Sequence, residues 1–248
     1  MLSLENAEII KFEKIDSTNL EANRILKDHD ISNPLWIVAE EQSHGKGRMG
    51  NEWISIKGNL YASLIIPIVC ELKFLPMLSC SVALSVYDCI AKYLLDDSLL
   101  KIKWPNDILY DNSKLSGILI ENIIGSNRKH SIIGIGININ SSPVNVSHKT
   151  TFLNEIKKSY EMLNVKEVFE TLHLSLEKYF NSFKEEKLKS LKDELTSKAW
   201  KINEIVKFKS NNRLSSGRLE GFTDKFEIMI NIEGDMLILN SGELSFNY

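Results

Sequence analysis

Residues 133–140 alternate strictly between isoleucine and small or amide residues, in the order Ile-Gly-Ile-Gly-Ile-Asn-Ile-Asn. Side chains of a β-strand point to opposite faces in turn, so the isoleucines share one face, and Gly134, Gly136 and Asn138 share the other. Two glycines inside a strand cost stability. A flat ligand against the bare face would explain them; a bulge or a crossing helix is the structural alternative. The pattern predicts a strand over 131–139 with a candidate ligand face.

Further strands and helices are expected on both sides of this strand, without a regular alternation of the two. Runs rich in β-branched and aromatic residues predict strands at 9–15, 35–40, 53–56, 60–67, 101–104, 108–110 and 115–124. N-cap residues predict a short helix at 20–26, and the most apolar stretch, with Pro76 near its start, predicts a core helix at 76–95. Helical spacing of apolar residues predicts a helical region at 150–198. Such a mixture is typical of the α+β class with a mainly antiparallel sheet.

The pattern of residues changes after Trp200, where short expected strands are separated by turn residues. Turns are expected in this part at 215–217, 233–235 and 240–242, and another at 111–113 joins two earlier strands. Short strands with frequent turns suit a small β-barrel. We therefore predict two domains, a larger α+β domain over 1–198 and a small β domain over 199–248.

Composition limits the classes of function. The 248 residues carry a net charge of −3, which argues against a general nucleic-acid-binding surface. Three cysteines without C-x-x-C spacing predict neither disulfides nor a zinc site and fit a reducing cytoplasm. The most apolar stretch, 74–87, is too short to cross a bilayer and is expected to be a buried helix, and residues 1–10 show no secretory signal. We expect a cytoplasmic protein that binds neither nucleic acid nor membrane.

The segment 45–50 places three glycines together with Lys46 and Arg48. Glycine lets the backbone approach a ligand closely, and the two cations can hold an anion by charge-assisted hydrogen bonds. The glycine spacing is that of a dinucleotide fingerprint, but that fingerprint requires a following helix, and strand residues follow here. We interpret the segment as a loop that holds a carboxylate or a phosphate. A glycine-rich hairpin with solvated cations is the alternative.

Two further polar clusters stand at the ends of expected elements. Ser17, Thr18 and Asn19 precede the helix at 20–26, where such residues either cap the helix or offer N–H and hydroxyl groups to a ligand. The run Lys103-Trp104-Pro105-Asn106-Asp107 ends a strand in a rigid proline turn that presents an amide and a carboxylate together. An ordinary Asn-Asp turn is the alternative reading of that run.

Lys114 stands at the start of a mostly apolar strand. There it either snorkels to solvent or meets an anionic partner, and Gly117 permits close approach in the same strand. The five histidines show no metal-ligand spacing, so we predict no metal held by the protein alone.

In their order along the chain, these motifs resemble those of the biotin protein ligase family. The matching segments are Ser17-Thr18-Asn19, Gln42, Gly45-Lys46-Gly47-Arg48-Met49-Gly50, Trp53, Lys103-Trp104-Pro105-Asn106-Asp107, Lys114-Leu115-Ser116-Gly117-Ile118-Leu119, Gly134-Ile135-Gly136-Ile137-Asn138 and Gly242-Glu243-Leu244-Ser245. They span nearly the whole chain. The family pattern has arginine at the position of Lys46, and lysine keeps the charge but lacks the bidentate fork.

The resemblance implies a catalytic domain over 1–198 similar to class II aminoacyl-tRNA synthetases, and an SH3-like barrel over 199–248. It implies that biotin carboxylate attacks the α-phosphate of ATP, giving biotinyl-5′-AMP and pyrophosphate. A lysine of a biotin carboxyl carrier protein then attacks this anhydride. Mg²⁺ is expected through the ATP phosphates, and the enzyme is expected as a monomer or a homodimer. Because the first strand begins near Ile9, we expect no N-terminal helix-turn-helix and no repressor function.

The resemblance also implies roles for individual residues. The expected biotin site consists of Ser17, Thr18, Asn19, Gln42, Gly45, Lys46, Gly47, Arg48, Lys114, Gly117 and Gly134. The expected ATP and adenylate site consists of Arg48, Trp53, Lys103, Asn106, Lys114 and Asn138. The expected catalytic residues are Lys114, Arg48, Asp107 and Lys103. Our own hypothesis is that Asp107 orients the attacking amine or accepts its proton.

Two alternative functions stay open on the sequence. A relative that acts on lipoate or octanoate would share the fold. A non-catalytic biotin-binding protein would share the pocket, but Lys103, Asp107 and Lys114 argue against it, because a pure binder needs no adenylation apparatus.

Overall fold

The computed structural model describes residues 3–68, 70–125, 129–181, 183–210, 213–240 and 242–245. A seven-stranded sheet with the order β1-β2-β3-β7-β6-β5-β4 forms its centre. Its strands are β1 Glu8–Ile15, β2 Leu35–Gln42, β3 Leu60–Pro67, β4 Leu100–Lys103, β5 Asp107–Tyr110, β6 Ser113–Ile124 and β7 Lys129–Ile137. The pair β1–β2 is parallel and the other neighbours are antiparallel.

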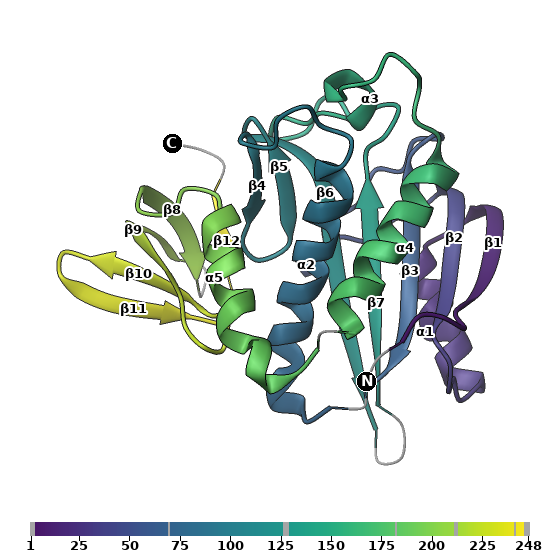
Figure 1. Ribbon diagram of the computed structural model, residues 1–248, viewed down its shortest axis with the longest axis horizontal. Helices are drawn as coiled ribbons and strands as arrows, with labels where there is room; N and C mark the ends of the chain where they lie inside the picture. Colours follow the sequence, from purple (N-terminus) through teal and green to yellow (C-terminus); the bar gives the residue numbers. More distant parts are fainter. Residues whose placement is uncertain are drawn as a thin grey trace.

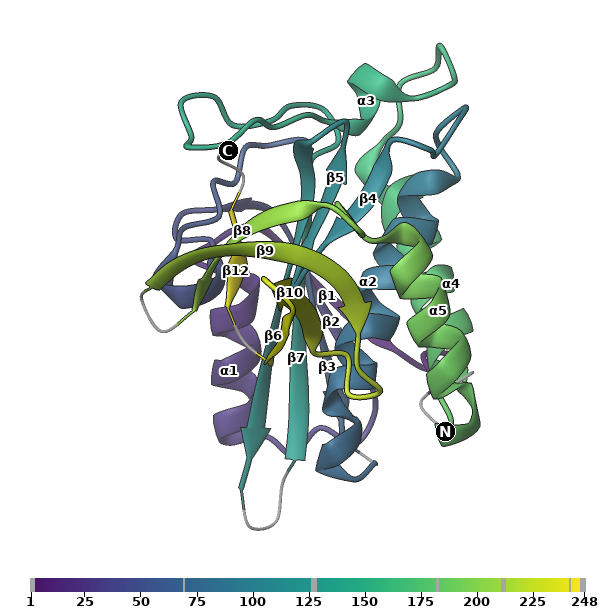
Figure 2. The ribbon, with the colours of Figure 1, turned by 90° about the vertical axis from the view of Figure 1, so that its left-hand side faces the viewer.

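Helices cover both faces of this sheet (Figures 1 and 2). The helices are α1 Thr18–Asp28, α2 Leu75–Ala91, α3 Leu153–Ile156, α4 Val165–Asn181 and α5 Leu188–Lys198. Helix α1 packs Ala22 and Leu26 against Ile37, Ile65 and Ile132 on one face. Helices α2 and α4 lie on the other face, where the larger apolar core forms. The predicted α+β class with a mainly antiparallel sheet is confirmed.

The alternating strand lies where its pattern predicts. Ile133, Ile135 and Ile137 of β7 are buried in the core under α2. Gly134 and Gly136 therefore face the α1 side, and Gly136 is paired with Gly117 of β6. The bare face of β7 thus continues onto the neighbouring strand.

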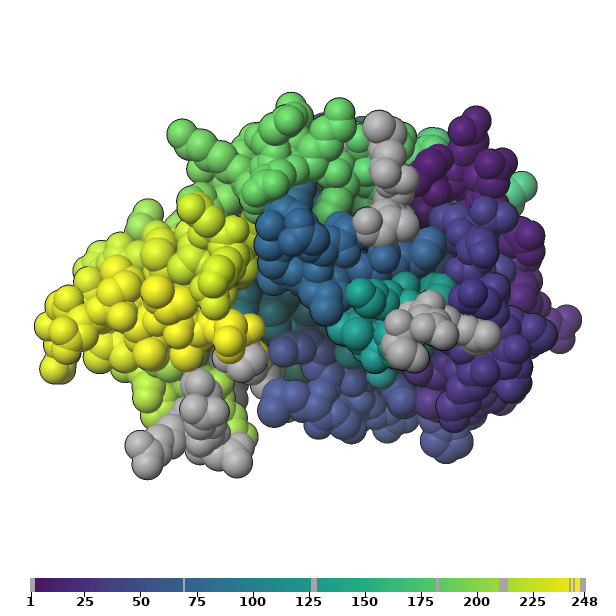
Figure 3. All heavy atoms as spheres, turned by 90° about the horizontal axis from the view of Figure 1, so that it is seen from below, coloured from purple at the N-terminus to yellow at the C-terminus, as the bar shows by residue number. Residues whose placement is uncertain are grey.

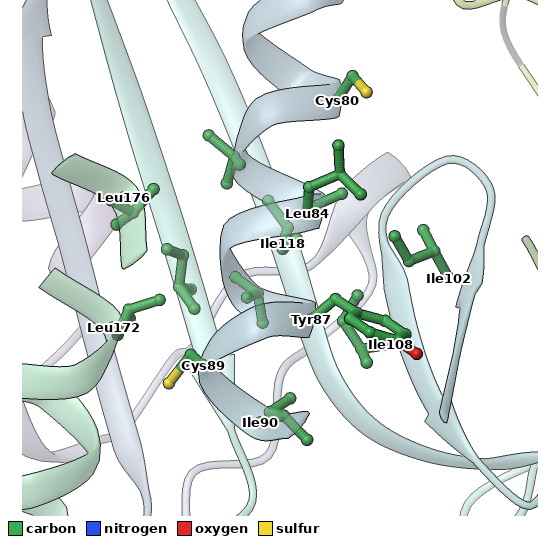
Figure 4. Close-up of a cluster of buried hydrophobic side chains, with 14 of the residues drawn as sticks. Cys80, Leu84, Tyr87, Cys89, Ile90, Ile102, Ile108, Ile118, Leu172 and Leu176 are labelled. Carbon is green, nitrogen blue, oxygen red and sulfur yellow. The ribbon is translucent and has the colours of Figure 1, made fainter. Parts of the chain in front are cut away.

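Helix α2 is the buried helix that the apolar stretch predicts, and it begins one residue earlier than expected. Pro76 stands in its first turn, where the missing N–H costs nothing. Figure 4 shows its side chains Leu84 and Ile90 among residues of the sheet strands and of α4. The helical segment 72–91 is apolar and long enough to cross a membrane, but 67% of its apolar 18-residue window is buried inside the molecule. Its apolar character is accounted for by the core.

The C-terminal part forms a separate antiparallel sheet with the order β11-β10-β9-β8-β12. Its strands are β8 Ile205–Ser210, β9 Arg213–Phe222, β10 Ile228–Ile232, β11 Asp235–Leu239 and β12 Glu243–Leu244. In the described residues no ladder joins the edge strands β11 and β12, so this small sheet is open there. Phe222 and Leu244 belong to the same apolar cluster as Ile102 and Trp200. The predicted boundary at 198/199 coincides with the end of α5 and stays a proposal.

Two local expectations are wrong. The first is the strand at 53–56, where the carbonyl of Trp53 accepts a hydrogen bond from Ser55 and that of Ile56 accepts one from Tyr61. The expected helical region at 150–198 is confirmed by α3, α4 and α5. Residues 157–164 between α3 and α4 are not helical, and Asn154 bonds across this break to the main chain of Leu163.

The second wrong expectation is the turn at 215–217, which lies inside β9. A Cβ on Gly217 would lie 2.5 Å from the side chain of Ile230, so this glycine serves strand packing and not a turn. The turns at 111–113 and 233–235 are confirmed by the positive φ angles of Asp111, Asn112 and Glu233. In the expected turn at 240–242, Ser241 lies outside the described residues.

Candidate active site

A cavity of about 340 Å³ opens on the α1 face of the sheet, beyond the first turn of α1. Most of the residues expected from the sequence line it together. These are Ser17, Thr18, Asn19, Gln42, Lys46, Gly47, Arg48, Trp53, Asn106, Asp107, Lys114, Gly117 and Gly134. The fold therefore brings five separate motifs to one place.

A polar network forms the end of the cavity at the first turn of α1. Ser17 occupies the N-cap position, but its side chain makes no capping bond, so helix capping does not account for its hydroxyl. Thr18 donates from its backbone N and from Oγ1 to Oε1 of Gln42, at 2.8 and 3.1 Å. Gln42 in turn donates to Ser55 at 2.9 Å. This end of the cavity offers several oriented polar groups to a neutral polar ligand.

The network continues beneath the cavity through Ser63 of β3. Its Oγ lies 2.7 Å from Thr18 Oγ1 and 2.6 Å from Asn19 Oδ1. Asn19 donates to Glu121 of β6 at 2.7 Å. Thr18, Asn19 and Ser63 are buried, so their hydrogen bonds fix the side chains that reach the cavity. Ser63 and Glu121 were not among the residues expected at the site.

The glycines of β6 and β7 allow two side chains to lie directly on the sheet. A Cβ on Gly134 would stand 2.2 Å from Asn19 Oδ1. Cβ atoms on Gly117 and Gly136 would stand 2.6 and 2.5 Å from the ring of Trp53. At Gly117 and Gly136 the indole of a loop covers this face, whereas at Gly134 the neighbour is Asn19 in the first turn of α1, so the alternative of a crossing helix holds at Gly134. The Nε1–H of Trp53 is buried, and no partner for it occurs within the described residues. A buried donor without a partner is costly, which fits a site completed by a ligand.

Three charged side chains meet where β4, β5 and β6 lie side by side. Lys114 Nζ lies 2.8 Å from Asp107 Oδ1, and Lys103 Nζ lies 3.8 Å from Asp107 Oδ2. Lys103 is 1% exposed and Asp107 5%. Two cations thus share one buried carboxylate, and the group keeps a surplus positive charge. Lys114 borders the cavity and can present that charge to an anion.

The loop 45–50 closes over the cavity through backbone contacts. Trp53 N donates to Gly45 O at 2.8 Å, and Gly47 N donates to Asn51 O at 2.7 Å. A Cβ on Gly45 would lie 2.3 Å from the carbonyl oxygen of Trp53, so glycine is required there by packing. Met49 has a φ of 55°, which is unusual for a residue other than glycine.

Arg48 ties this loop to two other parts of the chain. Its Nη1 donates to Asn106 Oδ1 at 3.3 Å and to the carbonyl oxygen of Gly242 at 3.4 Å. The contact to Gly242 joins the loop to the segment before β12. Lys46, in contrast, is exposed at the rim.

Three residues expected at the site do not line the cavity, namely Gly45, Lys103 and Asn138. Gly45 lets the loop pack against the carbonyl of Trp53, and Lys103 pairs with Asp107, as described above. Asn138 is 2% exposed and donates to the carbonyl of Thr151 at 3.1 Å. Its amide fixes the segment that follows β7.

That segment contributes residues that the sequence analysis missed. Val146, Ser147 and His148 line the cavity because the chain 141–151 returns to β6, where Lys114 N donates to Lys149 O at 2.8 Å. A polar connection of this length between a strand and a helix was a sequence signal for a functional loop. Tyr61 was also missed. Burial raises its pKa to about 12, so it stays protonated and donates to Ile56 O at 2.7 Å.

Comparison with known proteins gives consistent matches. The model of the biotin/lipoate A/B protein ligase family matches residues 11–138. A biotin–[acetyl-CoA-carboxylase] ligase of Paracoccus denitrificans is 34% identical over 131 residues, which are 52% of this chain and 54% of that protein. A bifunctional ligase/repressor of Bacillus subtilis is 36% identical over 137 residues, which are 54% of this chain and 41% of that protein.

A solved structure extends the match to nearly the whole chain. Biotin protein ligase from Aquifex aeolicus, in complex with biotin and ATP, is 29% identical, with a TM-score of 0.79 over 96% of this chain and 97% of that chain. The chain spans about half the length of the curated relatives it matches. The family model covers more than half of the chain, and the fold and the site agree with it. The chain belongs to the biotin/lipoate A/B protein ligase family.

Proposed function

We propose that this protein is an ATP-dependent biotin ligase that forms biotinyl-5′-AMP and transfers the biotinyl group to a lysine of a biotin carboxyl carrier domain. The observation that carries the proposal is the Lys114–Asp107–Lys103 group at the edge of a cavity floored by glycines. It supplies surplus positive charge where a carboxylate and a phosphate must meet. The similarity to a ligase solved with biotin and ATP supports the choice of substrates.

In this proposal the polar end of the cavity binds the ureido group of biotin. A ureido group has two N–H donors and one carbonyl acceptor, and the Ser17, Thr18 and Gln42 side chains offer both kinds of partner. Gly134 and Gly117 let Asn19 and the ring of Trp53 lie close against the sheet, and the bicyclic ring and its chain occupy the cavity that these residues line. The carboxylate then lies toward Lys114.

In the first step, a carboxylate oxygen of biotin attacks the α-phosphorus of ATP, and the bond to the bridging oxygen of pyrophosphate breaks. Negative charge builds on the phosphoryl oxygens, and preorganised cations stabilise that charge. Lys114 and Arg48 border the cavity and act in this role. Trp53 offers its ring face to the adenine, while Asn138 contributes by fixing the segment 141–151 and not by direct contact.

In the second step, the neutral amine of the acceptor lysine attacks the acyl carbon of the adenylate. The bond to the phosphate oxygen breaks, AMP leaves, and the proton that the amine loses passes to solvent. Asp107 faces two ammonium groups, so its geometry supports the orienting role in our hypothesis over the role of proton acceptor. Asn106, beside Arg48, lies at the entrance for the amine.

Mg²⁺ fits this site as an ion carried by ATP. Asp107 is engaged by lysines, and among the described residues no group of three His, Cys, Asp or Glu side chains could cage a metal. The ion would be held by phosphate oxygens and water, with Glu52 the other carboxylate that lines the cavity. When bound, it neutralises phosphate charge. The proposal also includes a cytoplasmic location and a monomeric or homodimeric enzyme.

The test is a two-stage assay with purified protein, ATP, Mg²⁺ and biotin. Pyrophosphate release reports the first step, and labelling of a carboxylase carrier domain reports the second. We expect Lys114→Ala to lower both rates by about a hundredfold or more, because it removes a cation from the charged transition state. The control Lys166→Ala changes an exposed lysine on α4, away from the cavity, and is expected to leave both rates intact.

The outcomes separate the alternatives. No labelling by the unmodified, folded protein would refute the proposal. Activation of lipoate or octanoate in preference to biotin would identify the other branch of the family. Biotin binding without pyrophosphate release would identify a non-catalytic binder.

A further inference from the structure

The side-chain amide of Asn19 bridges outer and inner strands of the sheet at the polar end of the cavity. Ser63 on β3 is paired with Gly134 on β7, and β7 is paired with β6 on its other side. The amide lies over Gly134, where a Cβ would stand 2.2 Å from the amide oxygen. It meets Ser63 on one side and Glu121 of β6 on the other. The missing side chain of Gly134 thus lets one amide connect two strands that are not neighbours.

Glu121 fixes which way round this amide stands. A carboxylate only accepts hydrogen bonds, and Glu121 Oε2 lies 2.7 Å from Asn19 Nδ2. The amide nitrogen therefore points to Glu121, and the amide oxygen points to Ser63, whose Oγ lies 2.6 Å away. Turning the amide over would bring two oxygens together beside Glu121 with no hydrogen between them.

The same constraint passes from Ser63 to Thr18. A hydroxyl group has one hydrogen, and Asn19 Oδ1 takes the hydrogen of Ser63. The contact of 2.7 Å between Ser63 Oγ and Thr18 Oγ1 then needs the hydrogen of Thr18. A second acceptor for that hydrogen is Gln42 Oε1 at 3.1 Å. Both acceptors belong to the protein, so Thr18 Oγ1 offers the cavity a lone pair and no hydrogen.

Attachment of α1 to the sheet does not account for these polar contacts. Beyond its first turn the helix packs through Ala22 and Leu26 against Ile132 of β7. Figure 3 shows the teal end of β6 and β7 beside the purple N-terminal part of the chain, to which α1 belongs. The polar contacts lead instead from Glu121, which is not among the residues that line the cavity, to Thr18, which is.

We propose that Glu121 is a positioning residue that acts through Asn19 to make Thr18 a strict hydrogen-bond acceptor. The cavity thereby selects a ligand that presents an N–H group at this end. The inference rests on the proposed function and specifies how that site recognises its substrate. The ureido group of biotin presents two N–H groups, whereas the dithiolane of lipoate and the alkyl chain of octanoate present none. The direction of these hydrogen bonds thus favours biotin.

The test compares biotin with its two carbamate analogues, in each of which one ureido N–H is replaced by a ring oxygen. Affinities are measured by titration calorimetry without ATP. In Glu121→Gln the side chain keeps its size but can also donate, so the Asn19 amide can turn over and free the Thr18 hydrogen for the ligand. We expect biotin affinity to fall about fivefold, and the preference for biotin over one of the two analogues to fall about tenfold. The value of kcat at saturating biotin should stay unchanged, because only ground-state binding is altered.

A reversed pair supplies the rescue. Asn19→Asp places a second carboxylate against Glu121 and should weaken biotin binding by about a hundredfold, since like charges in contact cost several kcal/mol. In the double variant Asn19→Asp/Glu121→Gln, the glutamine amide donates to the aspartate, whose other oxygen still accepts from Ser63. The pair keeps one negative charge, and we expect the affinity to recover by about tenfold or more. The control Glu220→Gln alters a half-buried glutamate of β9 and should change neither affinity nor preference.

An unchanged preference in Glu121→Gln, with biotin and both analogues weakened equally, would overturn the inference and leave Glu121 a purely structural role. Failure of the reversed pair to recover affinity would also overturn it, because the direction of the bonds would not pass through Asn19. If circular dichroism shows that Asn19→Asp does not fold, the preference measured in Glu121→Gln decides alone. A folded, unmodified protein that binds no biotin would instead refute the proposed function, and the inference with it.

Discussion

At the scale of single residues, Asp107 organises the charges of the site. It is buried between Lys103 and Lys114, and it stands opposite Gly117 in the β5–β6 ladder. Lys103 has no access to the cavity, so its contribution passes through Asp107. The carboxylate therefore sets where the ammonium of Lys114 stands.

The first prediction concerns Asp107→Asn. An amide cannot neutralise two ammonium groups, so Lys114 loses its anchor and the buried cations lose their partner. We expect pyrophosphate release and transfer to fall together by about a hundredfold, because misplacement of a catalytic group costs about that much. Single-turnover assays of each step are the measurement.

A loss confined to transfer would contradict the orienting role and assign Asp107 to proton transfer from the acceptor amine. The control is Asp111→Asn in the hairpin turn after β5. Asp111 has a φ of 45°, which asparagine also adopts readily, and it lies outside the cavity. Both steps should proceed normally in this variant.

Residue types were easier to predict than residue contacts. The motifs at 17–19, 103–107 and 114–117 were found because caps, proline turns and strand-end lysines have local signatures. Ser63 and Glu121 could not be found that way: they are a serine and a glutamate in strands, and only pairing with distant strands brings them to Asn19. The support of Lys103 for Lys114 likewise depends on strand register.

At the scale of elements, β6 and β7 and the segment after the glycine loop form one packed unit. Gly117 and Gly136 are paired across the two strands, and the ring of Trp53 covers both. Lys114 Nζ lies 5.4 Å from the centroid of the same ring. The indole of Trp53 thus contacts both the glycines of the sheet and the ammonium group of Lys114.

Gly136→Ala is predicted to displace Trp53. The added methyl would stand 2.5 Å from the indole, so the ring must move away from the sheet. We expect the free energy of unfolding to fall by about 1–3 kcal/mol, as for other overpacked sites. Chemical denaturation followed by tryptophan fluorescence is the measurement.

A double-mutant comparison identifies the cause. In a Trp53→Ala background, the same glycine substitution should cost much less, because the clashing ring is absent. Equal costs in the two backgrounds would show that the glycine is required for another reason, such as strand geometry.

A charged cluster joins the three longer helices on the other side of the sheet. Asp88 of α2 accepts hydrogen bonds from Lys178 of α4 and Lys198 of α5, at 2.8 and 3.0 Å. Tyr179 and Glu194 complete the group, with the tyrosine donating to Glu194 at 2.7 Å. Burial alone would raise the pKa of Asp88, but the two lysines outweigh it and hold that pKa below its ordinary value of 3.8.

The lowered pKa of Asp88 predicts how the free energy of unfolding depends on pH. A carboxyl whose pKa is lower in the folded state stabilises the fold above its unfolded pKa and loses that contribution as pH falls through the folded value. We expect unfolding free energy to drop below about pH 4 more steeply in the unmodified protein than in Asp88→Asn. Urea titrations across that range measure it.

The helix α5 supplies a matched control for Asp88. Asp193 is an exposed aspartate on that helix, and Asp193→Asn is expected to keep the acid dependence of the unmodified protein. Identical acid profiles for Asp88→Asn and the unmodified protein would contradict the stabilising role of the cluster.

Element types followed from the sequence where the pattern of residues was long, as in the apolar run of α2 and the strict alternation of β7. The expectations failed where partners decide the outcome. Residues 53–56 have strand composition, but β2 pairs with β1 and β3, and β3 pairs with β2 and β7, so neither strand has a free edge for a further strand. Gly217 resembles a turn residue, yet the approach of β10 requires it within β9.

At the scale of the whole molecule, one apolar cluster runs from the large sheet into the C-terminal sheet. Phe208, Phe222 and Leu244 belong to it together with Leu84 and Ile102. Trp200 N donates to Ile102 O at 2.9 Å, and Lys192 of α5 pairs with Asp224. The α+β class followed from the order of the elements, but this shared core had no sequence signal.

The shared core predicts that residues 1–198 alone are unstable. Without 199–248, Ile102 and neighbouring apolar groups lose their cover, and each buried apolar side chain contributes about 1.5–3 kcal/mol. We expect thermal unfolding of this fragment at a lower temperature and with less cooperativity than for the full chain. Adding residues 199–248 as a separate peptide should restore part of the stability. A fragment as stable as the full chain would show that the two predicted domains fold independently.

The contact between Arg48 and Gly242 ties the glycine loop to the C-terminal segment through a main-chain carbonyl. Any sequence able to adopt the same backbone would supply that carbonyl. The contact therefore depends on the path of the chain and not on the chemistry of a second side chain. The family model stops at residue 138, whereas the similarity to the Aquifex aeolicus structure spans 96% of the chain. The likeness in fold thus reaches the C-terminal sheet, which the family model leaves out.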